Sequence, residues 1–422
     1  MKLIYNYIHN FLNRAGSYVF LATVLSRILS FLASWIAVQF IENKALGEVL
    51  YAWTIISFLI PFVGMGLPQS LIRYGAIENS SESKNDLLNF VIRNGTFASI
   101  FLTFLIAVFG LLFPFTIKNT QIFLPLLSLS FVPFFLFETI KIQLRLQHQN
   151  KKYSLIEISY NIALVILVLI LSFIYKEMGY AFALVLAPSL VSILFFKEIG
   201  INHFKRNNQL TVKPKELWKY GFFGGLSNVA TILLFSIDLL LIGNILMNSE
   251  LVTAYKYVSL IPFSVLFIPR VFITTDFVTF TEQILNKNYI FNYIKSYILL
   301  FLMISGLFVL ITFFFSEELL SLFDSDFIKF SDSFQILCIG VCGILIFRGL
   351  FGNLLSSIGL VKINYYISLS ALILNYISNQ FLIPKYGIKG AALTSAILMW
   401  LTGIASFILF FIFYKKLPFK KL

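Results

Sequence analysis

Long apolar stretches recur along the whole chain, and they constrain its fold more than any other feature. The run from residue 16 to residue 41 contains one charged side chain, Arg27. About 20 apolar residues at 1.5 Å rise per residue cross the hydrocarbon core of a bilayer. The 422 residues are 59% hydrophobic and only 12% charged, whereas a soluble domain carries roughly 25% charged residues. The sequence therefore predicts an all-α polytopic membrane protein.

Twelve segments are long and apolar enough to be transmembrane helices. They cover residues 16–41, 48–72, 90–114, 121–140, 153–175, 179–200, 218–246, 252–279, 290–315, 334–357, 363–383 and 389–414. The connections are too short for a folded soluble domain. The first apolar run is also too long for a cleavable signal peptide, whose apolar region has about 7–15 residues.

Lysine and arginine are concentrated in alternate loops, which sets the orientation. Cytoplasmic loops carry an excess of these residues. The basic loop 202–216 then lies inside the cell and the acidic loop 316–333 outside. We expect both termini to be cytoplasmic in a multi-pass membrane protein. This orientation also accounts for the net charge of +13, so nucleic-acid binding is not expected.

Sequence signatures of catalytic, nucleotide or metal sites are not found. Cys338 and Cys342 share one face of an apolar helix, and the three histidines are scattered, so no metal-ligand set is predicted. The Asp-Ser-Asp sequence at 324–326 falls in an outside loop and reads as a solvated turn. These observations favour a protein that is not an enzyme.

An internal repeat divides the segments into two sets of six. GYAFALVLAPSLVS begins at Gly179 and GIKGAALTSAILMW begins at Gly387, an offset of 208 residues. We therefore expect an N-terminal lobe at 1–201, a basic cytoplasmic linker at 202–217 and a C-terminal lobe at 218–422. Six spans is an even number, so both lobes have the same orientation, and transporters place substrate sites between such repeats.

Several charges fall inside the apolar segments, where each costs at least about 2.5–3.5 kcal/mol. One reading is that they line a watery cavity, and the other is that they form structural ion pairs between helices. Arginines outnumber acids among them, and the guanidinium fork suits phosphate. The sequence therefore indicates a cationic cavity and an anionic substrate. The candidates are Arg27, Arg270 and Arg348, with Arg73 at the edge of its segment, and the acids Asp238 and Asp276.

Prolines fall in pairs in two segments that occupy equivalent places in the repeat. Pro61 and Pro68 lie in the second segment, and Pro262 and Pro269 in the eighth. Proline removes a backbone hydrogen bond and bends a helix. We expect these two helices to be kinked.

Three stretches resemble a known family. They are SRILSF at 26–31, GLPQSLIRYG at 66–75, and the sequence LIPKYGIKGAA that follows Asn375 and Asn379. Together with twelve spans and a basic midpoint, they are similar to polysaccharide flippases of the multidrug/oligosaccharidyl-lipid/polysaccharide exporter superfamily.

The resemblance implies a flippase of the bacterial inner membrane that carries an undecaprenyl-pyrophosphate-linked oligosaccharide, such as an O-antigen unit, from the cytoplasmic to the periplasmic leaflet. It implies two lobes around a cationic central cavity, with membrane lipids, a polysaccharide polymerase and a chain-length regulator as partners. Arg27 and Arg73 would meet the pyrophosphate, and Arg270 and Arg348 would line the C-terminal lobe. Asp238 and Asp276 would bind a coupling H⁺ or Na⁺ or balance the arginines, and no other cofactor is implied.

Two other functions stay open at this point. An ion-coupled small-molecule antiporter of the same superfamily would favour acidic cavity residues for organic cations. A polysaccharide polymerase is also polytopic, but it would need a sizeable periplasmic loop, and the largest outside loop here is short and acidic.

Overall fold

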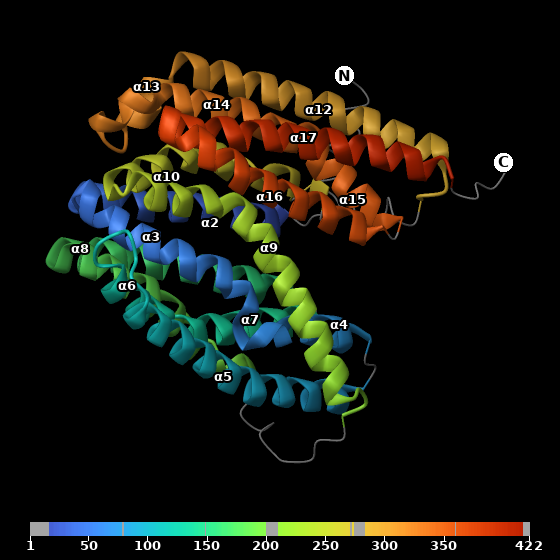
Figure 1. The fold of residues 1–422 in the computed structure, drawn as a ribbon. Helices are drawn as coiled ribbons and strands as arrows, with labels where there is room; N and C mark the ends of the chain where they lie inside the picture. Colours follow the sequence, from blue (N-terminus) through green and yellow to red (C-terminus); the bar gives the residue numbers. More distant parts are fainter. Residues whose placement is uncertain are drawn as a thin grey trace. The chain divides into compact units, whose positions relative to one another are not determined.

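The computed structural model describes residues 17–77, 80–147, 149–199, 210–270, 272–273, 283–358 and 360–416, and every element in these ranges is helical (Figure 1). The first elements are α2 (Ser17–Phe40), α3 (Asn43–Leu59), η1 (Ile60–Gly66), α4 (Leu67–Ile77), α5 (Ser81–Leu112), α6 (Thr120–Ser128), α7 (Phe131–Leu146), α8 (Asn150–Leu194), η2 (Phe196–Ile199) and α9 (Pro214–Leu246). The remaining elements are α10 (Ser249–Ser264), α12 (Lys287–Phe314), α13 (Ser316–Ser321), η4 (Ser325–Phe330), α14 (Ser331–Gly343), η5 (Ile344–Arg348), α15 (Gly349–Ser357), α16 (Val361–Tyr386) and α17 (Ile388–Tyr414).

Ten helical stretches among the described residues are long and apolar enough to cross a membrane. One of them, α8, contains two expected segments, because Lys176 breaks it with a φ of 51°. The 33-residue helix α9 covers the expected segment 218–246. Each expected segment is thus mostly helical over its described residues, and the all-α polytopic fold class is confirmed.

The described helices form two compact units, one within 21–253 and one within 254–416, the second also containing 17–20. In the first unit, α9 packs against α3, η1 and α4. In the second unit, α14 and α16 both pack against α17 (Figure 1). Contacts thus divide the chain after α9, whereas the repeat predicts a division at 202–217. Half of that linker, 202–209, lies outside the described residues, and the six-and-six lobes stay a prediction.

The second span is broken in its middle, as its prolines predict. Helix α3 ends at Leu59, and the chain passes through η1, where Gly64 and Gly66 have φ of 60° and 74°. The Gly64 amide donates to the Ser99 hydroxyl at 2.9 Å, which replaces a helical hydrogen bond. A Cβ on Gly66 would lie 2.0 Å from the Gly221 carbonyl oxygen. Glycine is required there because α9 touches the backbone of the break.

The eighth span is also interrupted near a proline. Helix α10 includes Pro262 and ends at Ser264. Two turn residues follow before the helix resumes at 267–270. Kinks are therefore confirmed in both of the spans that carry proline pairs.

Two helical hairpins, 150–194 and 361–414, show the internal repeat directly. A Cβ on Gly179 would lie 1.9 Å from the Leu171 carbonyl oxygen, and a Cβ on Gly390 would lie 2.2 Å from the Leu382 carbonyl oxygen. Both pairs are 211 positions apart (179 to 390, 171 to 382). The offset of 208 is therefore wrong by three residues: Gly179 is equivalent to Gly390, the residue at the close helix contact.

Candidate functional site

Arg348 lies in an unusual turn within the membrane-spanning stretch Ser325–Leu355. The turn, η5, is a π-helix between α14 and α15. Such turns are rare, and they occur frequently at functional sites. The hydroxyl of the buried Tyr297 on α12 donates to the Leu345 carbonyl at 3.1 Å and so fixes this turn from the side.

Hydrogen bonds from Arg348 reach two neighbouring helices. Its Nη1 donates to Asn364 Oδ1 at 2.9 Å and to Ser406 Oγ at 2.6 Å. Its Nη2 donates to Ser368 Oγ at 3.2 Å and to the Asn364 carbonyl at 3.4 Å. Asn364 is itself held by a 2.6 Å bond to the Gly352 carbonyl. We call Arg348, Asn364, Ser368 and Ser406 the Arg348 cluster.

Every acceptor in the Arg348 cluster is electrically neutral. No carboxylate among the described residues forms an ion pair with Arg348. The cluster thus positions a guanidinium at membrane depth and leaves its positive charge uncompensated by these residues. Such a charge attracts an anion strongly because the local dielectric is low.

Two exposed tyrosines follow Asn364 of the Arg348 cluster on α16. Arg348, Asn364 and Ser368 are half-buried, and Ser406 is fully buried. Tyr365 and Tyr366 follow Asn364 on α16 and are exposed, with their ring centroids 5.6 Å apart.

A second buried cation, Lys141 on α7, has the opposite environment. Its Nζ lies 3.0 Å from Glu138 and 2.8 Å from Glu157 on α8, and 4.6 Å from the centre of the Phe137 ring. Lys141 is 9% exposed. The sequence predicts the Glu138 pair from its i,i+3 spacing but does not reveal Glu157. We call Lys141, Glu138 and Glu157 the Lys141 cluster.

The other expected arginines lie on other helices. Arg27 is exposed on α2, in the first unit. Arg270 is exposed at the end of the stretch Ser249–Arg270, in the second unit. Arg73 lies on α4, and its side chain is outside the described part of the structure. Their proposed contact with one substrate stays a prediction.

Of the two expected acids, one is described. Asp238 on α9 is 1% exposed. A hydrogen bond from the Tyr51 hydroxyl on α3 to Asn244 ties the following turns of α9 to α3. Asp276 lies outside the described residues. Ion coupling by either acid stays a prediction.

Sequence reasoning missed the neutral partners of Arg348. Asn364 and Ser368 lie one helical turn apart on α16, and this spacing places them on one face. A polar face on an apolar helix indicates a polar partner, but the sequence does not show that the partner is Arg348. Ser406 lies on α17 and carried no signal.

Comparison with known proteins agrees with this architecture. The protein family described as "Polysaccharide biosynthesis protein" matches residues 12–273. No curated protein matches the chain.

Solved structures of transporters have the same fold. The lipid II flippase MurJ in an inward closed conformation has a TM-score of 0.72 and 19% identity, over 96% of this chain and 93% of that chain. An inward-facing multidrug resistance MATE family transporter of the MOP superfamily has a TM-score of 0.67 and 13% identity, over 94% and 98%. A MOP superfamily transporter from Pyrococcus furiosus has a TM-score of 0.65 and 12% identity, over 96% of this chain and 95% of that chain. At these identities the likeness shows the fold alone.

Proposed function

Because the chain belongs to the polysaccharide biosynthesis protein family, we propose that it is a flippase for a lipid-linked oligosaccharide. Its substrate would be an undecaprenyl-pyrophosphate-linked unit of O-antigen or a related polysaccharide. The chain would move this unit from the cytoplasmic to the periplasmic leaflet of the bacterial inner membrane by alternating access, with both termini in the cytoplasm.

The observation that carries the proposal is the neutral shell of Arg348. A guanidinium that is half-buried in a membrane span and bonded to amide, hydroxyl and carbonyl groups keeps its full charge for a ligand. The four bonds occupy the Nη hydrogens, so a phosphate would be held by this charge and by the Nε hydrogen, which none of these bonds uses. A pyrophosphate is the part of the proposed substrate that most needs such a partner in a low-dielectric site.

Transport of this kind needs no covalent chemistry. Each unpaired polar group costs several kcal/mol in hydrocarbon, so sugars and a pyrophosphate cross very slowly unaided. A polar path that opens to each side in turn removes that barrier while the lipid tail stays in the bilayer. We accordingly propose a transporter and not an enzyme.

Other residues have proposed roles that rest on the sequence. Arg27 and Arg73 would contact the pyrophosphate, and Arg270 would line the same path as Arg348. Asp238 and Asp276 would bind the coupling H⁺ or Na⁺ or balance the arginines. A polysaccharide polymerase and a chain-length regulator would receive the translocated unit.

Arg348→Gln tests the proposal in proteoliposomes. The assay measures delivery of a fluorescent undecaprenyl-pyrophosphate oligosaccharide to the far leaflet. We expect wild type to deliver it, and Arg348→Gln to lose most of the activity because the amide has no charge. Lys385→Gln is the matched control: it removes one exposed positive charge from α16 and should be active. Equal delivery by Arg348→Gln and Lys385→Gln would overturn the role of Arg348, and failure of wild type with a matched glycan would overturn the flippase.

A further inference from the structure

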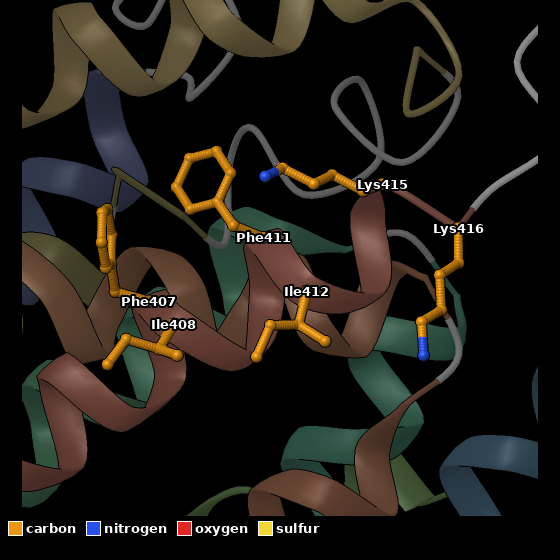
Figure 2. Close-up of a pocket in the computed structure, with 6 residues that line it drawn as sticks. All are labelled: Phe407, Ile408, Phe411, Ile412, Lys415 and Lys416. Atoms are coloured by element: carbon orange, nitrogen blue, oxygen red, sulfur yellow. The ribbon is translucent and has the colours of Figure 1, made fainter.

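The last turns of α17 form two parallel ridges that both end in a lysine. Phe407, Phe411 and Lys415 follow one another at four-residue spacing, and Ile408, Ile412 and Lys416 do the same one position later. Residues four apart are neighbours on a helix surface. Figure 2 shows these six side chains along the end of the helix, where they line a groove of about 710 Å³.

The wall made by the phenylalanines is rigid. The Phe407 and Phe411 rings lie 5.0 Å apart, and each packs on Phe351 at 5.0 and 5.8 Å. Phe351 itself is fully buried in the core of the second unit. This wall is therefore fixed by the fold whatever lies against it.

The wall made by the isoleucines is open to the surroundings. Ile408 is 49% exposed and Ile412 is 46% exposed. Ile408 and Ile412 thus offer apolar surface to a flexible hydrocarbon chain.

The two lysines give the groove a positive end. Both are exposed, and among the described residues neither forms an ion pair. Lys416 Nζ lies 5.5 Å from the centre of the Phe413 ring. Helix α17 has 27 residues, about 40 Å at 1.5 Å per residue. A hydrocarbon core of about 30 Å then leaves the lysine end of α17 at the level of the lipid headgroups.

We propose that this groove is a binding site for an anionic glycerophospholipid of the surrounding membrane. An acyl chain lies between the phenylalanine and isoleucine ridges, and the lipid phosphate lies between Lys415 and Lys416. Charge complementarity selects the occupant, because a zwitterionic lipid carries its own ammonium group beside the phosphate and brings no net negative charge to the two lysines. The site is separate from the Arg348 cluster and does not depend on the proposed transport function.

Native mass spectrometry of the detergent-purified full chain tests this site. The probes are phosphatidylglycerol and phosphatidylcholine with identical acyl chains. We expect wild type to retain phosphatidylglycerol in preference, and Lys415→Gln/Lys416→Gln to lose that preference at least several-fold. The matched control, Lys362→Gln/Lys385→Gln, removes two exposed positive charges from α16 and should keep the preference.

A second variant tests the apolar half of the site. Ile412→Trp fills the groove and leaves both lysines in place, so it should also reduce retention of phosphatidylglycerol. Equal retention of both lipids by wild type, or unchanged preference in the double-lysine variant, would overturn the proposal. Full retention by Ile412→Trp would overturn the acyl-chain site. If soluble glycerol phosphate raises the midpoint of thermal unfolding as much as phosphatidylglycerol does, the groove is a site for free anions and the assignment to a lipid is overturned.

Discussion

The Lys141 and Arg348 clusters each contain a cation that packs against the first helix of a repeated hairpin, but their electrostatics differ. Lys141 contacts Glu157 on the first helix of the hairpin 150–194. Arg348 contacts Ser368 on the first helix of the hairpin 361–414. Positions 157 and 368 are equivalent, since they are separated by the same 211 residues as Gly179 and Gly390. One hairpin neutralises the cation that packs against it, and the other only positions it.

This difference distinguishes a structural cation from a cation that can bind a ligand. A lysine between two glutamates has no charge left for a ligand, and its place in the first unit resembles that of a buried ion pair in any protein core. An arginine among hydroxyl and amide oxygens is equally well oriented but keeps its charge. We therefore assign a role in stability to the Lys141 cluster and a role in substrate binding to the Arg348 cluster.

The largest effect on stability is expected for Lys141→Met. It leaves two glutamates without their cation, and breaking a fully buried pair costs about 3–5 kcal/mol. We expect roughly 2–3 kcal/mol here, because the Glu138 and Glu157 side chains are 39% and 35% exposed and solvent screens them. Thermal unfolding in detergent should show a marked drop in midpoint. Lys152→Met is the control, because its 2.8 Å pair with Glu198 involves a lysine that is 49% exposed, and exposed pairs contribute about 0–1 kcal/mol. Equal midpoints for the two variants would contradict a structural role for Lys141.

A smaller loss of stability is expected where the two helices within each hairpin approach each other closely. Gly390→Ala places a Cβ 2.2 Å from the Leu382 carbonyl oxygen, and Gly179→Ala places one 1.9 Å from that of Leu171. Overpacking of this kind costs about 1–3 kcal/mol. Gly306→Ala is the control, since nothing lies within 4 Å of its Cβ. Unfolding midpoints should fall for both hairpin variants and not for the control; a change in one hairpin alone would break the equivalence.

The smallest effect is expected at the turns of the hairpins. Lys176 has φ 51° and ψ −129°, and its counterpart Gly387 has φ 58° and ψ −139°. Glycine adopts this conformation without the steric cost that lysine meets. Lys176→Gly should therefore stabilise the first hairpin by about 1 kcal/mol. Lys176→Ala removes the same charge and keeps the strain, so a similar gain for alanine would refute this explanation.

Much of the fold follows from the sequence because lipid imposes simple demands. Runs of apolar residues place the helices, and proline pairs place the breaks in the second and eighth spans. The register of the repeat does not follow so easily. A lysine occupies the turn of the first hairpin, so the first glycines of the two stretches, Gly179 and Gly387, do not correspond.

The site is predicted less completely than the fold. A charge in an apolar segment marks Arg348 as unusual, because its cost demands a partner. Which partner it has depends on side chains from two other helices, and only packing brings Asn364, Ser368 and Ser406 to it. For the same reason the sequence shows Glu138 beside Lys141 and not Glu157.

Ser368→Glu tests whether Arg348 acts through an uncompensated charge. This variant gives the second hairpin the carboxylate that Glu157 provides in the first. Ser368→Gln, of the same size and uncharged, is the control. We expect Ser368→Glu to insert into the membrane and to unfold at a temperature no lower than Ser368→Gln does. In the proteoliposome assay it should deliver lipid-linked oligosaccharide at least about tenfold more slowly than Ser368→Gln, a change of about 1.4 kcal/mol. Equal delivery by the two variants would contradict this expectation.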